Sequence, residues 1–142
     1  MCECPLCNWE TSTKVRPADV QFLVNPEAPD GVQSANLLGR VKESGFYVAR
    51  FKLPAFMKQP AHTHPDDRTY TVISGTMFSG VGTRFDPDAL VELPPGSFYN
   101  MPKDIPHFSW TRKGEVIMQV TGHGPSGFVY CDPADDPRNK AR

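Results

Sequence analysis

The chain has 142 residues, of which 39% are hydrophobic and 11% aromatic, which suits one domain with its own core. Its 15 lysines and arginines against 16 aspartates and glutamates give a formal net charge of −1, so nothing points to nucleic acid or an anionic membrane as a partner. The longest apolar runs, such as VIMQV at 116–120, are far below the roughly 18 residues that span a bilayer. No secretory signal is visible at the N-terminus, so we expect a cytoplasmic location.

Residues 1–20 are expected to form an N-terminal arm that carries a cluster of cysteines, Cys2, Cys4 and Cys7. A structural zinc site is one interpretation of this cluster, but such a site needs four Cys or His ligands and only three lie close together. The other interpretation is reduced thiols on a mobile end of the chain. Disulfides are not expected in a reducing compartment.

The chain from 21 to 132 is predicted to be an all-β barrel of short strands, because prolines and glycines recur at short intervals and leave no room for long helices. Each predicted strand is rich in β-branched and aromatic residues. Turn signals between the strands are NPEAPDG, FDPDA, LPPG and RKGE. The predicted strands are 20–24, 46–53, 69–82, 98–102, 107–111, 116–123 and 127–132. The polar residues 133–142 are expected to form a C-terminal tail, whose last residues are disordered or draped over a neighbour.

Three of the four histidines are predicted to meet inside this barrel. His62 and His64 are separated by one residue, and side chains two apart on a strand point to the same face. His107 opens another strand, where Pro102 and Pro106 stiffen the approach. Three imidazoles from two strands are suited to hold one divalent metal ion, whereas His123 in a GHGP turn is not a first-choice ligand.

The segments around these histidines resemble the two motifs of the cupin family. HTHPDDRTYTVISG at 62–75 is similar to the first motif and PKDIPHFSWT at 102–111 to the second. His62, His64 and His107 occupy the histidine positions, Gly75 the closing glycine and Pro102 the proline of the second motif. The resemblance implies a single-domain cupin double-stranded β-helix, that is, a jelly-roll barrel.

The sequence departs from the family pattern at the metal-binding glutamate, where it has Arg68. Arginine stays protonated and cannot act as a ligand, so three neutral imidazoles are expected to hold the ion. Asp66 or Asp67 is an alternative ligand if the loop is shifted, although strand alternation favours position 68 on the face of His64. Asp104 replaces a glycine and Thr111 an asparagine of the second motif, which are expected to be tolerable loop changes.

A guanidinium beside a divalent ion makes a strongly positive cavity, which favours an anion. A carboxylate, enolate or α-keto acid would complete the coordination sphere while Arg68 pairs with it in bidentate fashion. The alternative is that Arg68 turns outward to Asp66 or Asp67 and metal affinity is reduced. Tyr70 shares the parity of Arg68, and Gln119 is expected to face the cavity from a third strand.

The resemblance implies a metal-dependent enzyme acting on a small anionic or enolisable molecule, with Arg68, Tyr70 and Gln119 as candidate catalytic residues. Some cupin dioxygenases use three-histidine sites for iron, so the resemblance makes an oxidoreductase of the dioxygenase type the first expectation. Nickel, manganese, zinc and cobalt remain possible metals. The alternatives are a metal-dependent isomerase or cyclase, and a non-catalytic ligand-binding or sensor cupin. The resemblance also implies a homodimer.

Overall fold

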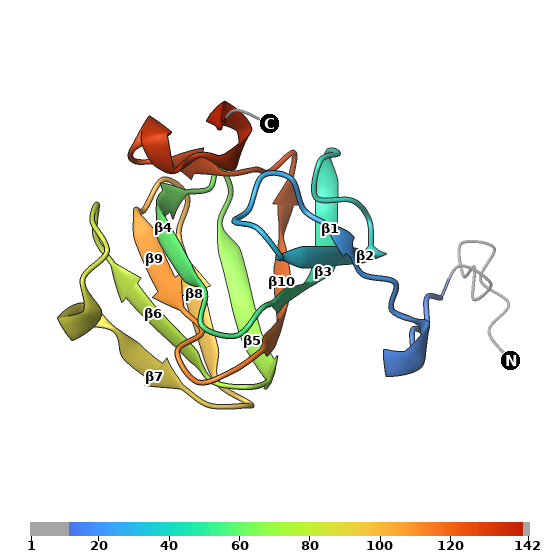
Figure 1. Cartoon of the computed structure of the whole chain (residues 1–142). Helices are drawn as coiled ribbons and strands as arrows, with labels where there is room; N and C mark the ends of the chain where they lie inside the picture. The colour runs from blue at the N-terminus through green and yellow to red at the C-terminus, as the bar shows by residue number, and fades with distance from the viewer. Residues whose placement is uncertain (1–11, 141–142) are drawn as a thin grey trace, which may run out of the picture.

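The computed structural model describes residues 12–140 as two antiparallel β-sheets that face each other (Figure 1). One sheet has six strands in the order β1-β2-β3-β10-β5-β8: Leu23–Val24, Gln33–Leu38, Gly45–Leu53, Val116–Gly124, Arg68–Ser74 and Phe98–Met101. The other has five in the order β11-β4-β9-β6-β7: Val129–Tyr130, Lys58–Thr63, His107–Trp110, Met77–Val81 and Val91–Leu93. The all-β jelly-roll architecture predicted from the sequence is confirmed.

The only helical elements in this described part of the chain are short 3₁₀ turns. They are η2 (Pro17–Asp19), η3 (Pro87–Ala89), η4 (Pro133–Asp135) and η5 (Pro137–Asn139). Each begins with a proline, whose fixed φ suits the first helical position. None of the helices formed by residues 12–140 has the length and apolar character needed to cross a bilayer.

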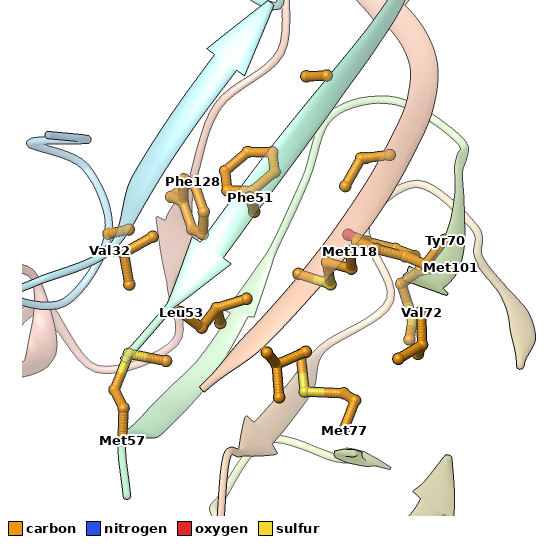
Figure 2. Packing of buried hydrophobic residues seen from close by; sticks show 14 of the residues in the cluster. Val32, Phe51, Leu53, Met57, Tyr70, Val72, Met77, Met101, Met118 and Phe128 are labelled. Carbon is orange, nitrogen blue, oxygen red and sulfur yellow. The ribbon is translucent and has the colours of Figure 1, made fainter. Parts of the chain in front are cut away.

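The core lies between the two sheets, and strand alternation determines which residues enter it. On β3, Tyr47, Ala49, Phe51 and Leu53 are buried while the residues between them are not. Its neighbour β10 buries Val116, Met118 and Val120 in the same way. Figure 2 shows side chains of this core, including Phe51, Leu53 and Met118, packed together. Full burial of such a side chain contributes about 1.5–3 kcal/mol, so these strands are held by a continuous apolar layer.

Gly75 makes the turn between β5 and β6, as its place in the first motif suggests. Its φ is +75°, and a Cβ atom there would lie 2.1 Å from the carbonyl oxygen of Glu115. Only glycine tolerates both that conformation and that close approach.

Three strands were missed by sequence reasoning, the predicted strands 20–24 and 127–132 are each reduced to two residues, and the predicted strand 69–82 is divided into β5 and β6. The sequences of β2, β4 and β7 are polar or short: QSANLL, KQPAHT and VEL. Of the predicted strand 20–24, only Leu23–Val24 pairs with β2. In these segments the strand forms because a neighbouring strand pairs with it, and not because its own residues have a high β-propensity.

The C-terminal segment folds back onto its own barrel as far as it is described, while the final residues 141–142 lie outside the described part. The Arg138 guanidinium donates to the Phe128 carbonyl oxygen at 2.8 Å and forms an ion pair with Glu27 at 3.0 Å. Cys131 is exposed and forms no disulfide in the described residues. Cys2, Cys4 and Cys7 lie outside the described residues.

Candidate metal centre

The three histidines come from two adjacent strands of the five-stranded sheet. His62 lies near the end of β4, His64 directly follows that strand, and His107 begins β9. His62 and His107 are register partners across the β4–β9 pair. One ring nitrogen of each histidine lies within 4.8 Å of those of the other two, and all three residues are buried. The predicted meeting of these imidazoles is therefore present.

Backbone carbonyl groups determine which nitrogen of each ring is available. Nδ1 of His62 lies 2.7 Å from the Pro60 oxygen, Nδ1 of His64 2.8 Å from the Gly127 oxygen, and Nδ1 of His107 2.9 Å from the Ile105 oxygen. A carbonyl oxygen only accepts, so each Nδ1 carries a hydrogen and donates it. The lone pairs are left on the three Nε2 atoms, and that of His64 faces Arg68 NH1 at 3.4 Å. Three neutral imidazoles with oriented Nε2 atoms are a donor set that fits one divalent ion.

A register irregularity in β4 is what brings His62 inward. The β4–β9 register shifts between Gln59 and His62, and both of these residues are buried although their positions differ in parity. Pro60 lies within the shift, where its missing N–H removes a ladder hydrogen bond. After the shift, His62 and His64 share the inner side of the sheet.

His64 is also fixed from the loop before β9. The Asp104 amide donates to the His64 carbonyl oxygen at 2.9 Å, and Asp104 has a φ of +62°. Aspartate is one of the few residues other than glycine that adopts this left-handed conformation with little strain. The replacement of the motif glycine by Asp104 is thus accommodated in the loop.

Burial keeps the three imidazoles neutral. Desolvation lowers the pKa of His62 and of His64 well below the ordinary value, and the positive Arg68 lowers both further. Desolvation also lowers the pKa of His107, to about 4. Neutral imidazole is the form that binds a metal, so the site is ready for a metal at neutral pH.

The metal-free protein is therefore expected to lose stability in acid. Because the unfolded imidazole binds a proton more readily than the folded one, stability falls as the pH drops from 6.5 towards 4. The shift of His107 alone corresponds to about 3 kcal/mol at 1.36 kcal/mol per unit. Urea unfolding in EDTA at pH 7 and pH 4.5 measures the loss, and His107→Asn should reduce it. An equal loss in wild type and His107→Asn would contradict this assignment.

Arg68 lies inside the barrel beside the histidines, with only 2% of its surface exposed. Its Nε lies 3.4 Å from Asp66 Oδ1, and NH2 donates to the Ser126 hydroxyl at 2.7 Å. Its NH1 lies 3.4 Å from Nε2 of His64, one of the three convergent nitrogens. The guanidinium therefore pairs with Asp66, as the alternative expected, but it does so inside the barrel and faces the candidate metal site.

The two nearby aspartates are engaged elsewhere and do not belong to the histidine group. Asp66 is buried and accepts from Arg68, from Ser126, from the Tyr47 hydroxyl at 2.7 Å and from the His123 amide at 3.2 Å. Asp67 is exposed and accepts from the Lys103 amide at 2.8 Å. The alternative in which one of them replaces the missing glutamate ligand is wrong in this geometry.

A narrow cavity adjoins the histidines and is lined mainly by apolar side chains, among them Met77, Met118 and Phe128. Its free volume is about 20 Å³, which is room for about one water molecule. Tyr70 lines it, as its parity predicts, and stacks on Tyr99 with ring centroids 4.6 Å apart. Burial raises the pKa of Tyr70, while the charge of Arg68 and a hydrogen bond with it act in the opposite direction. Tyr70 therefore keeps its proton at neutral pH.

Gln119 does not line the cavity, so its predicted orientation is wrong. On β10 the buried positions are Val116, Met118 and Val120, and Gln119 lies on the opposite face, where its Oε1 accepts from Arg50 at 3.1 Å. Met118, the preceding residue, faces the cavity from β10 instead and accepts from the Tyr99 hydroxyl. His123 is exposed and contacts Phe46.

Sequence reasoning also missed several polar residues of the cavity. Gln59, Ser79 and Tyr99 line it, but no motif marks them. Ser109 also lines the cavity, whereas Thr111 is buried outside it and donates to the Pro54 carbonyl oxygen. Ser79 lies in the predicted strand 69–82 and Tyr99 in the predicted strand 98–102, whereas Gln59 lies on β4, which was not predicted and whose register shift reverses the parity between Gln59 and His62.

No protein-family model matches the chain, and neither does any curated protein. Solved structures do match. The polyketide cyclase RemF from Streptomyces resistomycificus is 21% identical with a TM-score of 0.65, covering 89% of each chain. The DMSP lyase DddQ from Ruegeria pomeroyi is 18% identical with a TM-score of 0.63, covering 80% of this chain and 61% of that one.

An RmlC-like cupin from Shewanella frigidimarina is 11% identical, with a TM-score of 0.59 and coverage of 78% of this chain and 90% of that one. At these identities the similarity establishes the fold alone. Together with two facing antiparallel sheets and a buried trio of histidines between them, it shows that the chain has the cupin fold.

Proposed function

We propose that the chain is a metal-dependent enzyme that acts on a small anionic or enolisable molecule. The observation that carries the proposal is the convergence of three Nε2 atoms beside a buried guanidinium. Three neutral ligands leave the charge of a divalent ion uncompensated, and Arg68 adds a further positive charge in a poorly solvated cavity. Such a site favours a ligand that brings negative charge.

Two nitrogens of the Arg68 guanidinium are held by protein groups, and the third, NH1, faces the histidines. Asp66 and Ser126 hold its Nε and NH2, so the guanidinium cannot easily swing out of the cavity. Its NH1 points to His64 Nε2, whose lone pair a metal would occupy. NH1 would then donate to an oxygen of the bound anion, which is a charge-assisted hydrogen bond. In this role Arg68 orients the substrate beside the metal.

The dioxygenase class suits the cavity best. Among the described residues that line it, no carboxylate is present to abstract a proton, and Asp66 already accepts four hydrogen bonds. A substrate that arrives as an enolate or carboxylate needs no protein base. A redox-active metal such as iron, when bound by the histidines, would supply oxygen activation. The apolar wall of Met77, Met118 and Phe128 keeps bulk water away from the reacting molecule.

An isomerase or cyclase is the second candidate, favoured by the position of Tyr70. Its hydroxyl stays protonated next to Arg68 and would donate a proton to an enolate oxygen or carbon. RemF, to which the fold is similar, is a polyketide cyclase. A non-catalytic ligand-binding role would use the same Arg68 contact without turnover.

Two measurements separate these functions. Protein reconstituted with Fe²⁺ is expected to consume oxygen when 2,4-pentanedione is added, and Arg68→Met should reduce the rate at least tenfold, since a charge-assisted hydrogen bond contributes about 1.5–3 kcal/mol. Solvent deuterium incorporation into the same diketone faster than its spontaneous exchange, without oxygen uptake, would favour the isomerase or cyclase. Binding with neither reaction would favour the sensor. A homodimer and a cytoplasmic location remain predictions.

A further inference from the structure

A row of three polar side chains crosses the interior face of the five-stranded sheet. Gln59 of β4, Ser109 of β9 and Ser79 of β6 are neighbours in register, since Ser109 pairs with Gln59 on one side and with Ser79 on the other. Their exposed fractions are 6%, 4% and 9%, and all three line the cavity. Apolar residues at such positions would avoid the cost of burying polar groups. We call these residues the polar row.

The polar row presents a hydrogen-bond donor to the cavity. The Ser109 hydroxyl donates to Gln59 Oε1 at 2.9 Å, so the carbonyl end of this amide is engaged. No hydrogen bond to its Nε2 is found within residues 12–140. No fully buried side-chain nitrogen or oxygen in that range lacks a partner, so Gln59 Nε2 reaches the cavity surface. Its two N–H groups are free to bind an acceptor there.

Tyr99 supplies a second donor from the opposite sheet. Its hydroxyl donates to Met118 Sδ at 3.8 Å, and a thioether is a weak acceptor. Burial raises the pKa of Tyr99 well above its usual value, while a hydrogen bond with Ser79 lowers it. The hydroxyl therefore remains a donor at neutral pH and can exchange its sulfur partner for a ligand oxygen.

The spacing of residues along β9 gives the distance between the polar row and the histidines. Ser109 is two residues beyond His107 on β9, and a strand advances about 3.3 Å per residue, so the two are roughly 7 Å apart. Met77 and Met118 line the space between the sheets. Since the free volume there is about 20 Å³, a ligand larger than water requires Met77 and Met118 to move, which an unbranched and adaptable side chain allows.

We infer that the polar row and Tyr99 form a second oxygen-binding subsite, which selects substrates carrying two oxygen functions. The inference rests on the proposed function, in which the first, anionic function binds at the metal and Arg68. The second is a neutral acceptor, a ketone or comparable carbonyl, a few bonds away along the chain. Small oxo acids whose carbonyl lies three or four carbons from the carboxylate are the class that fits both ends.

The test compares two acids that differ only at that second oxygen. Isothermal titration calorimetry on the Zn²⁺-loaded protein would measure the affinities of 4-oxopentanoate and pentanoate. One or two hydrogen bonds make 4-oxopentanoate the tighter ligand by about tenfold. Gln59→Leu, which keeps the side-chain volume and removes the amide, is expected to reduce the ratio to about twofold or less. Gln119→Leu is the matched control on the outer face, and it should keep the wild-type ratio.

The outcomes separate this inference from the proposed function. Equal affinities in wild type, or a ratio that Gln59→Leu does not change, would overturn the subsite while leaving the anion site intact. If neither acid binds, the anion site at Arg68 is overturned. The subsite is then tested separately by adding 2-pentanone, which has the carbonyl but no carboxylate. The side-chain amide resonance of Gln59 is followed by ¹⁵N NMR during the titration. A resonance that moves supports the subsite, and one that stays in place overturns it.

Discussion

Replacement of Arg68 by methionine is expected to lower the free energy of unfolding by about 3–5 kcal/mol, the usual cost of removing one partner of a buried ion pair. Arg68 and Asp66 are both buried, with side chains 2% and 6% exposed. Without the guanidinium, the Asp66 carboxylate keeps its bonds from Tyr47, Ser126 and the His123 amide but has no compensating charge. Urea unfolding of the metal-free protein at pH 7 measures the effect.

Two variants serve as controls for this prediction. Lys113→Met breaks an exposed pair with Glu92, whose side chains are 63% and 56% exposed, and should cost less than about 1 kcal/mol. The double variant Asp66→Asn/Arg68→Met removes both charges and should recover much of the lost stability. A cost for Arg68→Met no greater than that for Lys113→Met would contradict the buried pair.

His107→Ala is expected to weaken the binding of Zn²⁺ by more than about a hundredfold. Loss of a residue that merely orients a metal ligand costs roughly 10–100-fold in affinity, and loss of one ligand of three should cost more. His107 is held by the Ile105 carbonyl oxygen so that Nε2 faces the other two rings. Competition with a chromophoric chelator at pH 7 measures the affinity.

His123→Ala is the control for this experiment, because His123 is exposed and lies outside the histidine group. It should bind Zn²⁺ as the wild type does. If His107→Ala retained wild-type affinity, the metal would have to be bound elsewhere, for example by the cysteines near the N-terminus.

The strands that carry most of the core were predictable from the sequence because their own residues specify them. On β3 and β10 apolar residues stand at nearly every second position and are the ones that are buried, which matches the strand period of two. The histidine trio was predictable for a similar reason, since two ligands lie next to each other in the sequence and the third opens a strong strand. Arg68 was placed correctly on the inner face by the same parity argument.

The surroundings of these residues were not predictable, because they come from distant parts of the chain. Ser126 and Tyr47, which hold Arg68 and Asp66 in place, lie 58 and 19 residues from those partners. The register shift in β4 reverses the parity between Gln59 and His62, and no local signal announces it. Gln119 was assigned to the wrong face of β10. The sequence marks no residue of that strand as facing the cavity, so it does not show which of the two alternating sets of side chains points inward.

The central claim is that three Nε2 atoms, each opposed by a protonated Nδ1, hold one divalent ion. Long-range ¹H–¹⁵N NMR of the imidazoles during a Zn²⁺ titration tests it most directly. We expect one equivalent of Zn²⁺ to shift the Nε2 resonances of His62, His64 and His107, with the Nδ1 resonances still those of protonated nitrogens. Saturating Zn²⁺ that leaves all three Nε2 resonances in place, or coordination through Nδ1, would contradict the account.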